Sequence, residues 1–235
     1  MRFAALLALW PTIAQATCAT DAMLVFDGST SMREANFLTG DTPKIEDARV
    51  AVARAMPEIA PFRRVGLMVY GPNTGAADSC SGISVRFGPR ADAADDVIAE
   101  VNALRPNGLT PLARSVEKAA DLLNYRDESA IVVLLTDGNE TCGGRPCAMS
   151  RMLASEAHDL TVHVIGWRMR AHDEYFRWNN PEQEFGADNV ASCFADATGG
   201  LFVTTETVDE LSEALQATLG CALFGARETP HPYAG

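Results

Sequence analysis

The feature that most constrains the fold is a set of uninterrupted apolar segments. The longest reads Ala-Ile-Val-Val-Leu-Leu-Thr-Asp over residues 130–137, and residues 22–27 (Ala-Met-Leu-Val-Phe-Asp) repeat the pattern. Residues 65–70 form a third run, and a strand is also predicted over residues 160–166. A strand with one face in water alternates apolar and polar residues, whereas a strand buried on both faces of a parallel sheet is apolar throughout. These segments therefore predict the central strands of a parallel sheet.

Segments with helical spacing separate these strands. Residues 44–59 place their apolar side chains on one side of a helix, and a proline follows. Residues 83–87 alternate apolar and polar side chains, which is typical of an edge strand. Further helices are predicted over 91–104, 111–125, 146–157, 188–197 and 208–219, with a short strand over 201–203. Strands that alternate with helices indicate an α/β fold. We expect a doubly wound, mostly parallel six-stranded sheet, Rossmann-like, with helices on both faces and one antiparallel edge strand.

The N-terminal residues have the features of an export signal. Residues 1–16 contain an arginine, an apolar stretch over residues 3–10 and an Ala-Gln-Ala cleavage sequence. The apolar stretch is shorter than the roughly 20 residues of a membrane span. Two alternatives stay open. The apolar stretch is then an ordinary buried helix or strand in place of a signal peptide, or the protein is a lipoprotein with a lipid attached to Cys18. We expect an exported protein, periplasmic or secreted, with a signal peptide (1–16), one domain (17–222) and a flexible tail (223–235).

Polar side chains follow two of the buried strands. Asp27, Ser29 and Ser31 come directly after the first strand in a D-x-S-x-S arrangement, and Asp137 ends the longest apolar run. Thr110 lies in a loop before a predicted helix. Ligands of such folds bind at the carboxyl ends of the strands, so we expect these five side chains to meet at one edge of the sheet. Carboxylate and hydroxyl oxygens suit magnesium, manganese or calcium rather than zinc.

The order of these motifs resembles the von Willebrand factor type A (VWA) domain. That family has a metal-ion-dependent adhesion site (MIDAS) built from a D-x-S-x-S, a G-x-T-P-L and an L-L-T-D-G segment, found here at residues 27–31, 108–112 and 134–138. The resemblance spans roughly residues 20–220, and residues 137–147 and 193–200 look like bacterial exported members. Thr30 departs from the family, which usually has glycine there.

The resemblance implies a role for each residue. Ser29, Ser31 and Thr110 would supply hydroxyl ligands to Mg²⁺ (or Mn²⁺ or Ca²⁺), and Asp27 and Asp137 would bind it directly or through water. Few direct carboxylate contacts leave such an ion electron-poor, so it would accept an exposed Asp or Glu side chain of a protein ligand. The resemblance therefore implies a divalent-cation-dependent protein-binding module for adhesion or assembly.

The six cysteines are expected to form disulfides, because export implies an oxidising compartment. Cys142 and Cys147 flank Gly-Gly-Arg-Pro, and the glycines permit the tight turn of a local bridge. A metal half-site is the alternative interpretation. The other four cysteines allow three pairings. Because the chain ends lie near each other in this fold, we expect the pairs Cys18–Cys221 and Cys80–Cys193.

Charge and missing motifs argue against other functions. A net charge of −12 argues against a nucleic-acid binder, which needs a basic face. The sequence contains no G-x-S-x-G elbow, P-loop or dinucleotide motif, and Ser29 stands where a haloacid dehalogenase phosphatase needs a second aspartate. His163 is interpreted as a core residue and His172 as a solvated one, so we expect no enzyme. A structural VWA domain without metal-dependent binding remains an alternative, as does a metal-dependent hydrolase.

An inserted loop is predicted over residues 168–186. It contains the aromatic residues Tyr175, Phe176, Trp178 and Phe185. Such rings either anchor a protein interface or pack beneath the loop. The sequence leaves both interpretations open, and it leaves the oligomeric state open as well.

Overall fold

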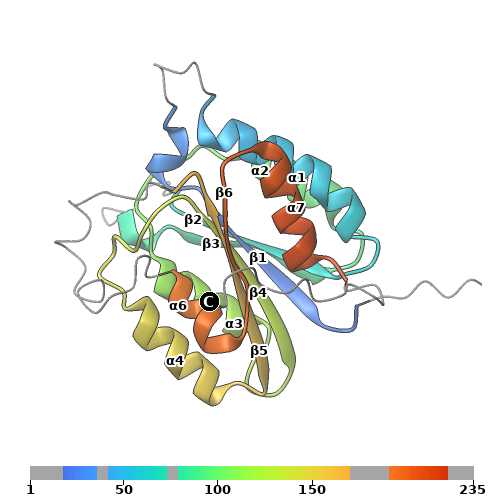
Figure 1. Cartoon of the computed structure of the whole chain (residues 1–235), viewed down its shortest axis with the longest axis vertical. Coiled ribbons are helices and arrows are strands. Elements are labelled where there is room, and N and C mark those ends of the chain that lie inside the picture. Colours follow the sequence, from blue (N-terminus) through green and yellow to red (C-terminus); the bar gives the residue numbers. More distant parts are fainter. Residues whose placement is uncertain (1–17, 36–41, 73–78, 170–190, 222–235) are drawn as a thin grey trace, which may run out of the picture.

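A single sheet forms the centre of the protein (Figure 1). The computed structural model describes residues 18–35, 42–72, 79–169 and 191–221. Its strands lie in the order β3-β2-β1-β4-β5-β6, and every neighbouring pair is parallel except β2 with β3. The expected α/β fold with one antiparallel edge strand is therefore confirmed. The strands are β1 (Asp21–Asp27), β2 (Val65–Tyr70), β3 (Ile83–Arg90), β4 (Ser129–Thr136), β5 (Asp159–Trp167) and β6 (Phe202–Thr205).

Helices cover both faces of this sheet. α1, α2 and α7 pack on one face, and α3, α4 and α6 pack on the other (Figure 1). The described helices are α1 (Lys44–Ile59), α2 (Ala94–Ala103), α3 (Leu112–Leu122), α4 (Pro146–Glu156), α6 (Ser192–Thr198) and α7 (Val208–Leu219). Two short 3₁₀ helices, η1 (Thr30–Arg33) and η2 (Ser79–Ser81), lie in the loops after β1 and before β3.

The central strand β1 shows why its sequence is apolar throughout. Leu24 and Phe26 pack into the core on the α1 side, whereas Met23 and Val25 pack into the core on the α3 side. All four side chains are fully buried. Since successive residues of a strand point to opposite faces, a strand covered on both sides needs an apolar residue at every position.

The neighbours of β1 determine where the loops meet. β1 lies between β2 and β4, and in its parallel pairing with β4 Phe26 stands beside Leu135. Asp27, the last residue of β1, and Asp137, the residue after β4, therefore lie at the same edge of the sheet. The chain continues from β1 toward β2 on one side and β4 lies on the other, which is the arrangement that opens a ligand site in doubly wound folds.

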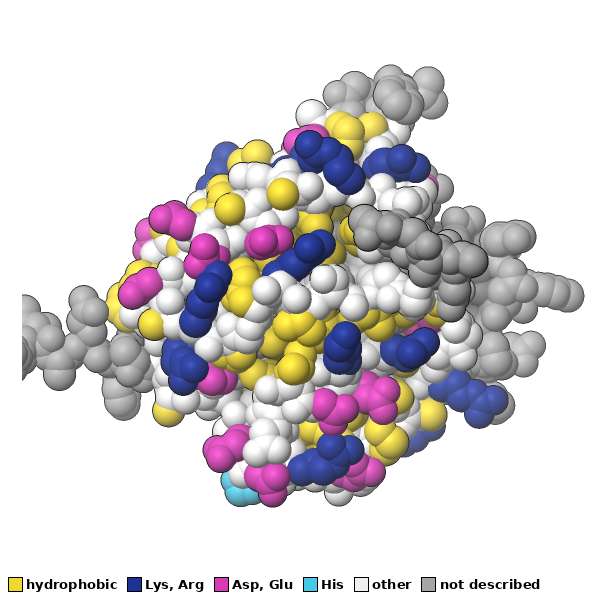
Figure 2. Space-filling view, turned by 180° about the vertical axis from the view of Figure 1, so that it is seen from behind, with side chains coloured by type: hydrophobic (Ala, Val, Ile, Leu, Met, Phe, Trp, Pro, Cys, Tyr) yellow, Lys and Arg dark blue, Asp and Glu magenta, His cyan; other side chains and the backbone are white. Residues whose placement is uncertain are grey.

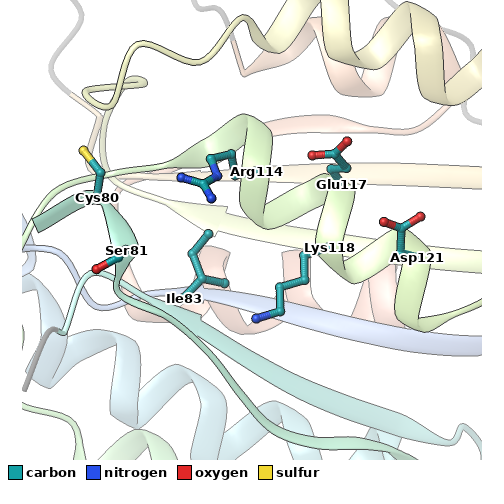
Figure 3. A pocket seen from close by; sticks show the side chains of 7 residues that line it. All are labelled: Cys80, Ser81, Ile83, Arg114, Glu117, Lys118 and Asp121. Atoms are coloured by element: carbon teal, nitrogen blue, oxygen red, sulfur yellow. The ribbon is translucent and has the colours of Figure 1, made fainter. Parts of the chain in front are cut away.

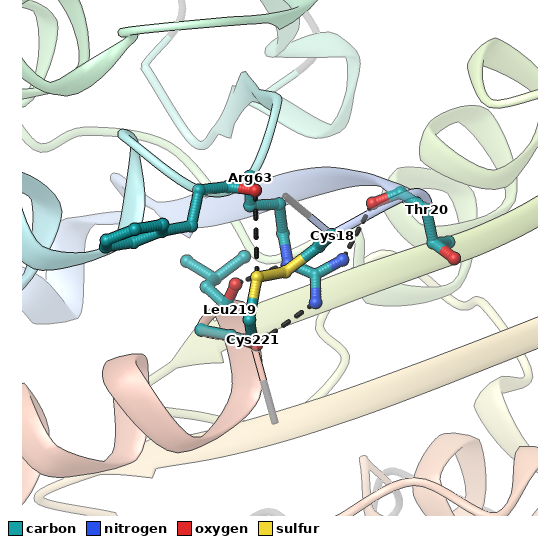
Figure 4. Close-up of a disulfide and its surroundings, with 7 residues drawn as sticks. Cys18, Thr20, Arg63, Leu219 and Cys221 are labelled. Carbon is teal, nitrogen blue, oxygen red and sulfur yellow. Dashed lines mark hydrogen bonds between the residues drawn. A yellow bond between two sulfur atoms is a disulfide. The ribbon is translucent and has the colours of Figure 1, made fainter. Parts of the chain in front are cut away.

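A disulfide joins the two ends of the domain (Figure 4). Cys18, before β1, is bonded to Cys221, after α7, as expected from the sequence. Arg63 lies beside this bond, and its guanidinium donates to the carbonyl of Leu219 at 2.5 Å and to that of Thr20 at 2.7 Å. The segment before β1 and the end of α7 are thus held together covalently and by hydrogen bonds.

The other two disulfides correct the expected pairing. Cys80 is bonded to Cys142 and Cys147 to Cys193, so the predicted pairs Cys142–Cys147 and Cys80–Cys193 are wrong. Pro146 begins α4, which places Cys147 in the first turn of a helix that packs against α6. Cys142 lies in the loop before that helix and reaches η2 instead. The start of α4 thus lies between the two neighbouring cysteines, and each pairs with a cysteine of another element.

Charges of both signs are interspersed on the surface. In the face shown in Figure 2, Asp and Glu side chains lie among Lys and Arg side chains. Ion pairs join several of them, such as Arg90 with Asp96 at 2.6 Å and Arg54 with Asp209 at 2.6 Å. Exposed pairs of this kind contribute little to stability.

Several predicted segments lie outside the described residues. They are residues 1–16, the tail 223–235 and, apart from its first two residues, the inserted loop 168–186. Within the described ranges, no helix combines the length and apolar character needed to cross a membrane. His163 lies in β5 and its Nδ1 accepts a hydrogen bond from the backbone of Leu201, which is a structural role.

Candidate metal centre

Asp27 is the most buried member of the candidate site, with no exposed surface. Its Oδ1 accepts a hydrogen bond from the backbone N–H of Ser29 at 2.8 Å, a local turn typical of aspartate. Its Oδ2 accepts from the hydroxyls of Tyr70 at 2.7 Å and Thr136 at 3.0 Å. Donors from the loop after β1 and from strands β2 and β4 therefore fix the carboxylate in one orientation at the edge of the sheet.

Three more predicted residues form a chain of contacts beside Asp27. η1 turns the backbone so that Ser29 Oγ and Ser31 Oγ lie 2.9 Å apart. Ser31 Oγ donates to Asp137 Oδ1 at 2.7 Å. Because a hydroxyl has a single hydrogen, Ser29 is then the donor to Ser31. The structure thus brings together the first and last motifs, which are about a hundred residues apart in the sequence.

Hydrogen bonds connect the loop that contains Thr110 to the loop after β1 and to the loop after β4. The backbone N–H and the hydroxyl of Thr30 both donate to the carbonyl of Gly108, at 3.1 and 3.0 Å. On the other side, the N–H of Thr110 donates to Thr141 Oγ1 at 2.8 Å, and the N–H of Thr141 donates back to the carbonyl of Thr110. Thr30, the departure from the family pattern, therefore joins two site loops.

A glycine that the sequence analysis did not consider shapes the loop after Asp27. Gly71 follows β2 with a φ of +101°, and a β-carbon there would lie 2.6 Å from Ser29 Cα. A larger residue at position 71 is therefore disfavoured for two reasons, the positive φ and the contact of its β-carbon with Ser29. The glycine lets the backbone after β2 pack closely against the loop that contains Ser29.

Lys44 is the main site residue that sequence reasoning missed. It is the first residue of α1, and only 8% of its surface is exposed. Its Nζ lies 2.8 Å from Asp137 Oδ2 and 3.7 Å from Glu34 Oε2. Lys44 and Asp137 are 93 residues apart in the sequence. The hydrophobic periodicity placed residue 44 at the start of a helix and gave no indication of a contact with Asp137. The rarity of lysine could have drawn attention to this residue, since Lys44 and Lys118 are the two lysines of the chain.

Glu140 is a second residue that the sequence analysis did not single out. Its buried carboxylate accepts hydrogen bonds from the N–H of Ala113 at 3.0 Å and the N–H of Cys142 at 2.7 Å. Ala113 lies in the first turn of α3, where N–H groups lack helical partners and a negative charge is favourable. Glu140 therefore fastens the loop after Asp137 to the start of α3, next to Thr110.

Burial changes the protonation of the site. It raises the pKa of Asp27 from 3.8 to about 7, and the charge of Asp137 acts in the same direction. Hydrogen bonds from Ser29 and Tyr70 oppose this rise without cancelling it. Burial also raises the pKa of Tyr70 well above 10, which keeps its hydroxyl a donor. A proton or another positive charge near Asp27 is therefore favourable.

The donor set fits a hard divalent cation. Asp27 and Asp137 offer carboxylate oxygens and Ser29 and Ser31 offer hydroxyl oxygens, which suit Mg²⁺, Mn²⁺ or Ca²⁺. The loop of Thr110 is tied to the loop of these serines through Thr30 and Gly108. Among the residues that the structure describes, no group of three or more His, Cys, Asp or Glu side chains could hold a metal ion. An ion at this edge would therefore depend on the hydroxyls as much as on the carboxylates.

Comparison with known families agrees with the fold. The sequence profile of the von Willebrand factor type A domain matches residues 22–140, a segment that contains all five predicted site residues. The chain belongs to the von Willebrand factor type A domain family. Two uncharacterized Bacillus subtilis proteins are related to this VWA domain at 28% identity. YwmC aligns over 66% of this chain and 70% of its own length, and YwmD over 83% of each.

Solved structures share the VWA fold at low sequence identity. The SpRpn10 VWA domain has a TM-score of 0.58 at 12% identity and covers 86% of this chain and 96% of its own. An aerotolerance-related membrane protein from Bacteroides fragilis has a TM-score of 0.59 at 16% identity. The match covers 86% of this chain and 98% of that protein's chain. Proximal thread matrix protein 1 from the mussel byssus has a TM-score of 0.54 at 15% identity, and this structure was solved with zinc in its MIDAS motif. The match covers 87% of this chain and 48% of that protein's chain.

Proposed function

We propose that this VWA domain binds a protein partner through a divalent cation at the edge formed by β1 and β4. VWA domains generally mediate protein interactions, and here the metal requirement is the specific part of the proposal. The observation that carries it is the chain of contacts from Ser29 through Ser31 to Asp137, placed beside the buried Asp27. These side chains gather oxygen donors from distant motifs at one edge of the sheet.

Each residue has a part in this proposal. Ser29, Ser31 and Thr110 would supply neutral oxygen ligands, and Asp27 and Asp137 would supply the negative charge, directly or through water. Bound there, Mg²⁺, Mn²⁺ or Ca²⁺ would provide an electrophilic centre for an exposed Asp or Glu of the partner. Tyr70 and Thr136 orient Asp27, while Glu140 keeps the Thr110 and Asp137 loops together.

We also propose that the protein works outside the cytoplasm, in the periplasm or extracellular space. Residues 1–16 have the features of a signal peptide. Three disulfides use all six cysteines, and such bonds persist in oxidising compartments. Both observations support export.

Calorimetric titration with Mg²⁺ and Mn²⁺ tests the metal requirement. The wild type should bind the ion, and Asp27→Ala should lose binding. Asp209→Ala is the matched control, because it removes an exposed aspartate from α7. A pull-down from the native envelope with and without EDTA then tests the partner step. If the wild type gives no metal-dependent heat beyond that of Asp27→Ala, the metal requirement is wrong.

One observation favours a second candidate, a VWA interaction domain that works without metal. Lys44 already places a positive charge on Asp137 at 2.8 Å. An ammonium at this position could stabilise the carboxylate permanently and leave the loops as a simple binding surface. Partner capture that persists in EDTA and in Asp27→Ala would favour this candidate.

A further inference from the structure

Lys44 has an unusual position for a lysine of this protein. The chain has 19 basic residues, of which 17 are arginines, and one of its two lysines lies buried at the candidate metal centre. Lysine carries its charge on a compact ammonium, whereas the arginine guanidinium is broad and planar. The ammonium contacts Asp137 Oδ2, while Asp137 Oδ1 accepts the hydrogen of Ser31. Both oxygens of this carboxylate therefore have partners before any ion binds.

The backbone of Lys44 is held while its side chain has two acidic neighbours. Its N–H donates to the carbonyl of Glu34 at 3.0 Å, and its carbonyl accepts from the indole Nε1 of Trp167 at 3.0 Å. The Nζ atom lies 2.8 Å from Asp137 but 3.7 Å from Glu34, whose side chain is 43% exposed. A rotation of the lysine side chain could transfer the ammonium from the buried acid to the exposed one without moving α1.

The charges show what such a transfer would change. With Asp27, Asp137 and Glu34 ionised, these three carboxylates and Lys44 together carry two negative charges. Without Lys44 they would carry three, so a divalent cation would be attracted more strongly. The lysine therefore disfavours the ion by repulsion and by its contact with Asp137.

We propose that Lys44 is a built-in competitor of the divalent cation for Asp137. When the ion binds, the ammonium would move from Asp137 toward Glu34. This inference rests on the proposed function, because it assigns Lys44 to the metal affinity of that same site. Lys44 acts here as a residue that sets metal affinity, not as a ligand.

Metal affinity of a lysine variant is the first test. Lys44→Met should lower the calorimetric Kd for Mn²⁺ by about tenfold or more, because one positive charge leaves the site. Lys118→Met is the control for the loss of one charge. Lys118 is exposed on α3 and lines a shallow pocket with Ile83 and Asp121 (Figure 3). Its variant should keep the wild-type Kd.

The second test uses the wild type, so it does not depend on how the variant folds. The protein is acetylated with an amine-reactive ester with and without saturating Mn²⁺, and the Lys44 and Lys118 peptides are quantified by mass spectrometry. Lys118 serves as an internal reference in the same sample. We expect Mn²⁺ to raise the labelling of Lys44 relative to Lys118 severalfold, since the ammonium leaves its buried partner.

The outcomes separate this inference from the proposed function. Equal Mn²⁺ affinity of the wild type, Lys44→Met and Lys118→Met would overturn the competitor role and leave metal binding intact. An unchanged labelling ratio at saturating Mn²⁺ would do the same. No binding by any of the three proteins would overturn both proposals. Binding by Lys44→Met together with weak or undetected binding by the wild type would support the competition.

Discussion

Ser31 Oγ donates a hydrogen bond to Asp137 Oδ1 at 2.7 Å, across 106 positions of sequence. The bond joins the loop after β1 to the loop after β4, and Ser31 also contacts Ser29. Ser31 is therefore one of the hydroxyls that join the two halves of the candidate centre, together with Thr136, which donates to Asp27. Loss of the Ser31 contact affects both loops at once.

Ser31→Ala should weaken Mn²⁺ binding by about tenfold or more, because it removes one oxygen ligand and the hydrogen-bond donor of Asp137. Calorimetry measures the change. Ser155→Ala is a suitable control, since Ser155 is exposed on α4 and its hydroxyl donates to a carbonyl of its own helix. An unchanged affinity in Ser31→Ala would remove Ser31 from the ligand set.

The metal-free protein should lose stability as pH rises from about 4 to about 7. The pKa of Asp27 is 3.8 in the unfolded reference and about 7 in the folded protein. Between these values the folded state holds more protons, so the free energy of unfolding falls with rising pH. Asp27→Asn should flatten this dependence. Urea unfolding in EDTA at several pH values measures both proteins, and equal slopes would contradict the assignment.

Glu140→Gln should lower the free energy of unfolding by about 1–3 kcal/mol. The carboxylate accepts two backbone hydrogen bonds, and a glutamine offers one oxygen and an NH₂ group that would face a second donor. Chemical denaturation gives the value. Glu58→Gln, at an exposed position of α1, is the control and should change little. Similar values for the two variants would show that Glu140 does not brace these loops.

Gly71→Ala should destabilise the domain by about 1–3 kcal/mol and weaken metal binding, because the new β-carbon meets the Ser29 backbone at a positive φ. Gly88→Ala is the matched control. Gly88 lies on the edge strand β3, where a β-carbon would meet no atom within 4 Å. Thermal unfolding compares the two, and a melting temperature of Gly71→Ala as high as that of Gly88→Ala would refute the close approach.

Non-reducing peptide mapping should find Cys80–Cys142 and Cys147–Cys193. Trypsin does not cleave the Arg145–Pro146 bond, so Cys142 and Cys147 remain in one peptide. That peptide should be cross-linked to two others, one with Cys80 and one with Cys193. The Cys193 peptide runs from residue 178 to residue 227 and also contains Cys221, so it should carry the Cys18 peptide as well. An internal loop of this single peptide would instead support the local bridge.

The strands and the order of the site motifs could be predicted because their signals are local. A strand buried on both faces needs apolar residues at successive positions, and residues 130–136 show this directly. The D-x-S-x-S motif and Asp137 follow strands whose ends meet at one edge of a parallel sheet, so their proximity follows from the fold class.

The contacts of Lys44 and Glu140 and the disulfide pairs were decided by tertiary structure. Lys44 reaches Asp137 because α1 begins at this edge of the sheet, and Cys147 reaches Cys193 because α4 packs against α6. Such contacts depend on how helices are placed in three dimensions, and residue spacing carries no signal for that placement. The sequence by itself determined which oxygen donors gather at the edge, and the tertiary structure decided which charges surround them.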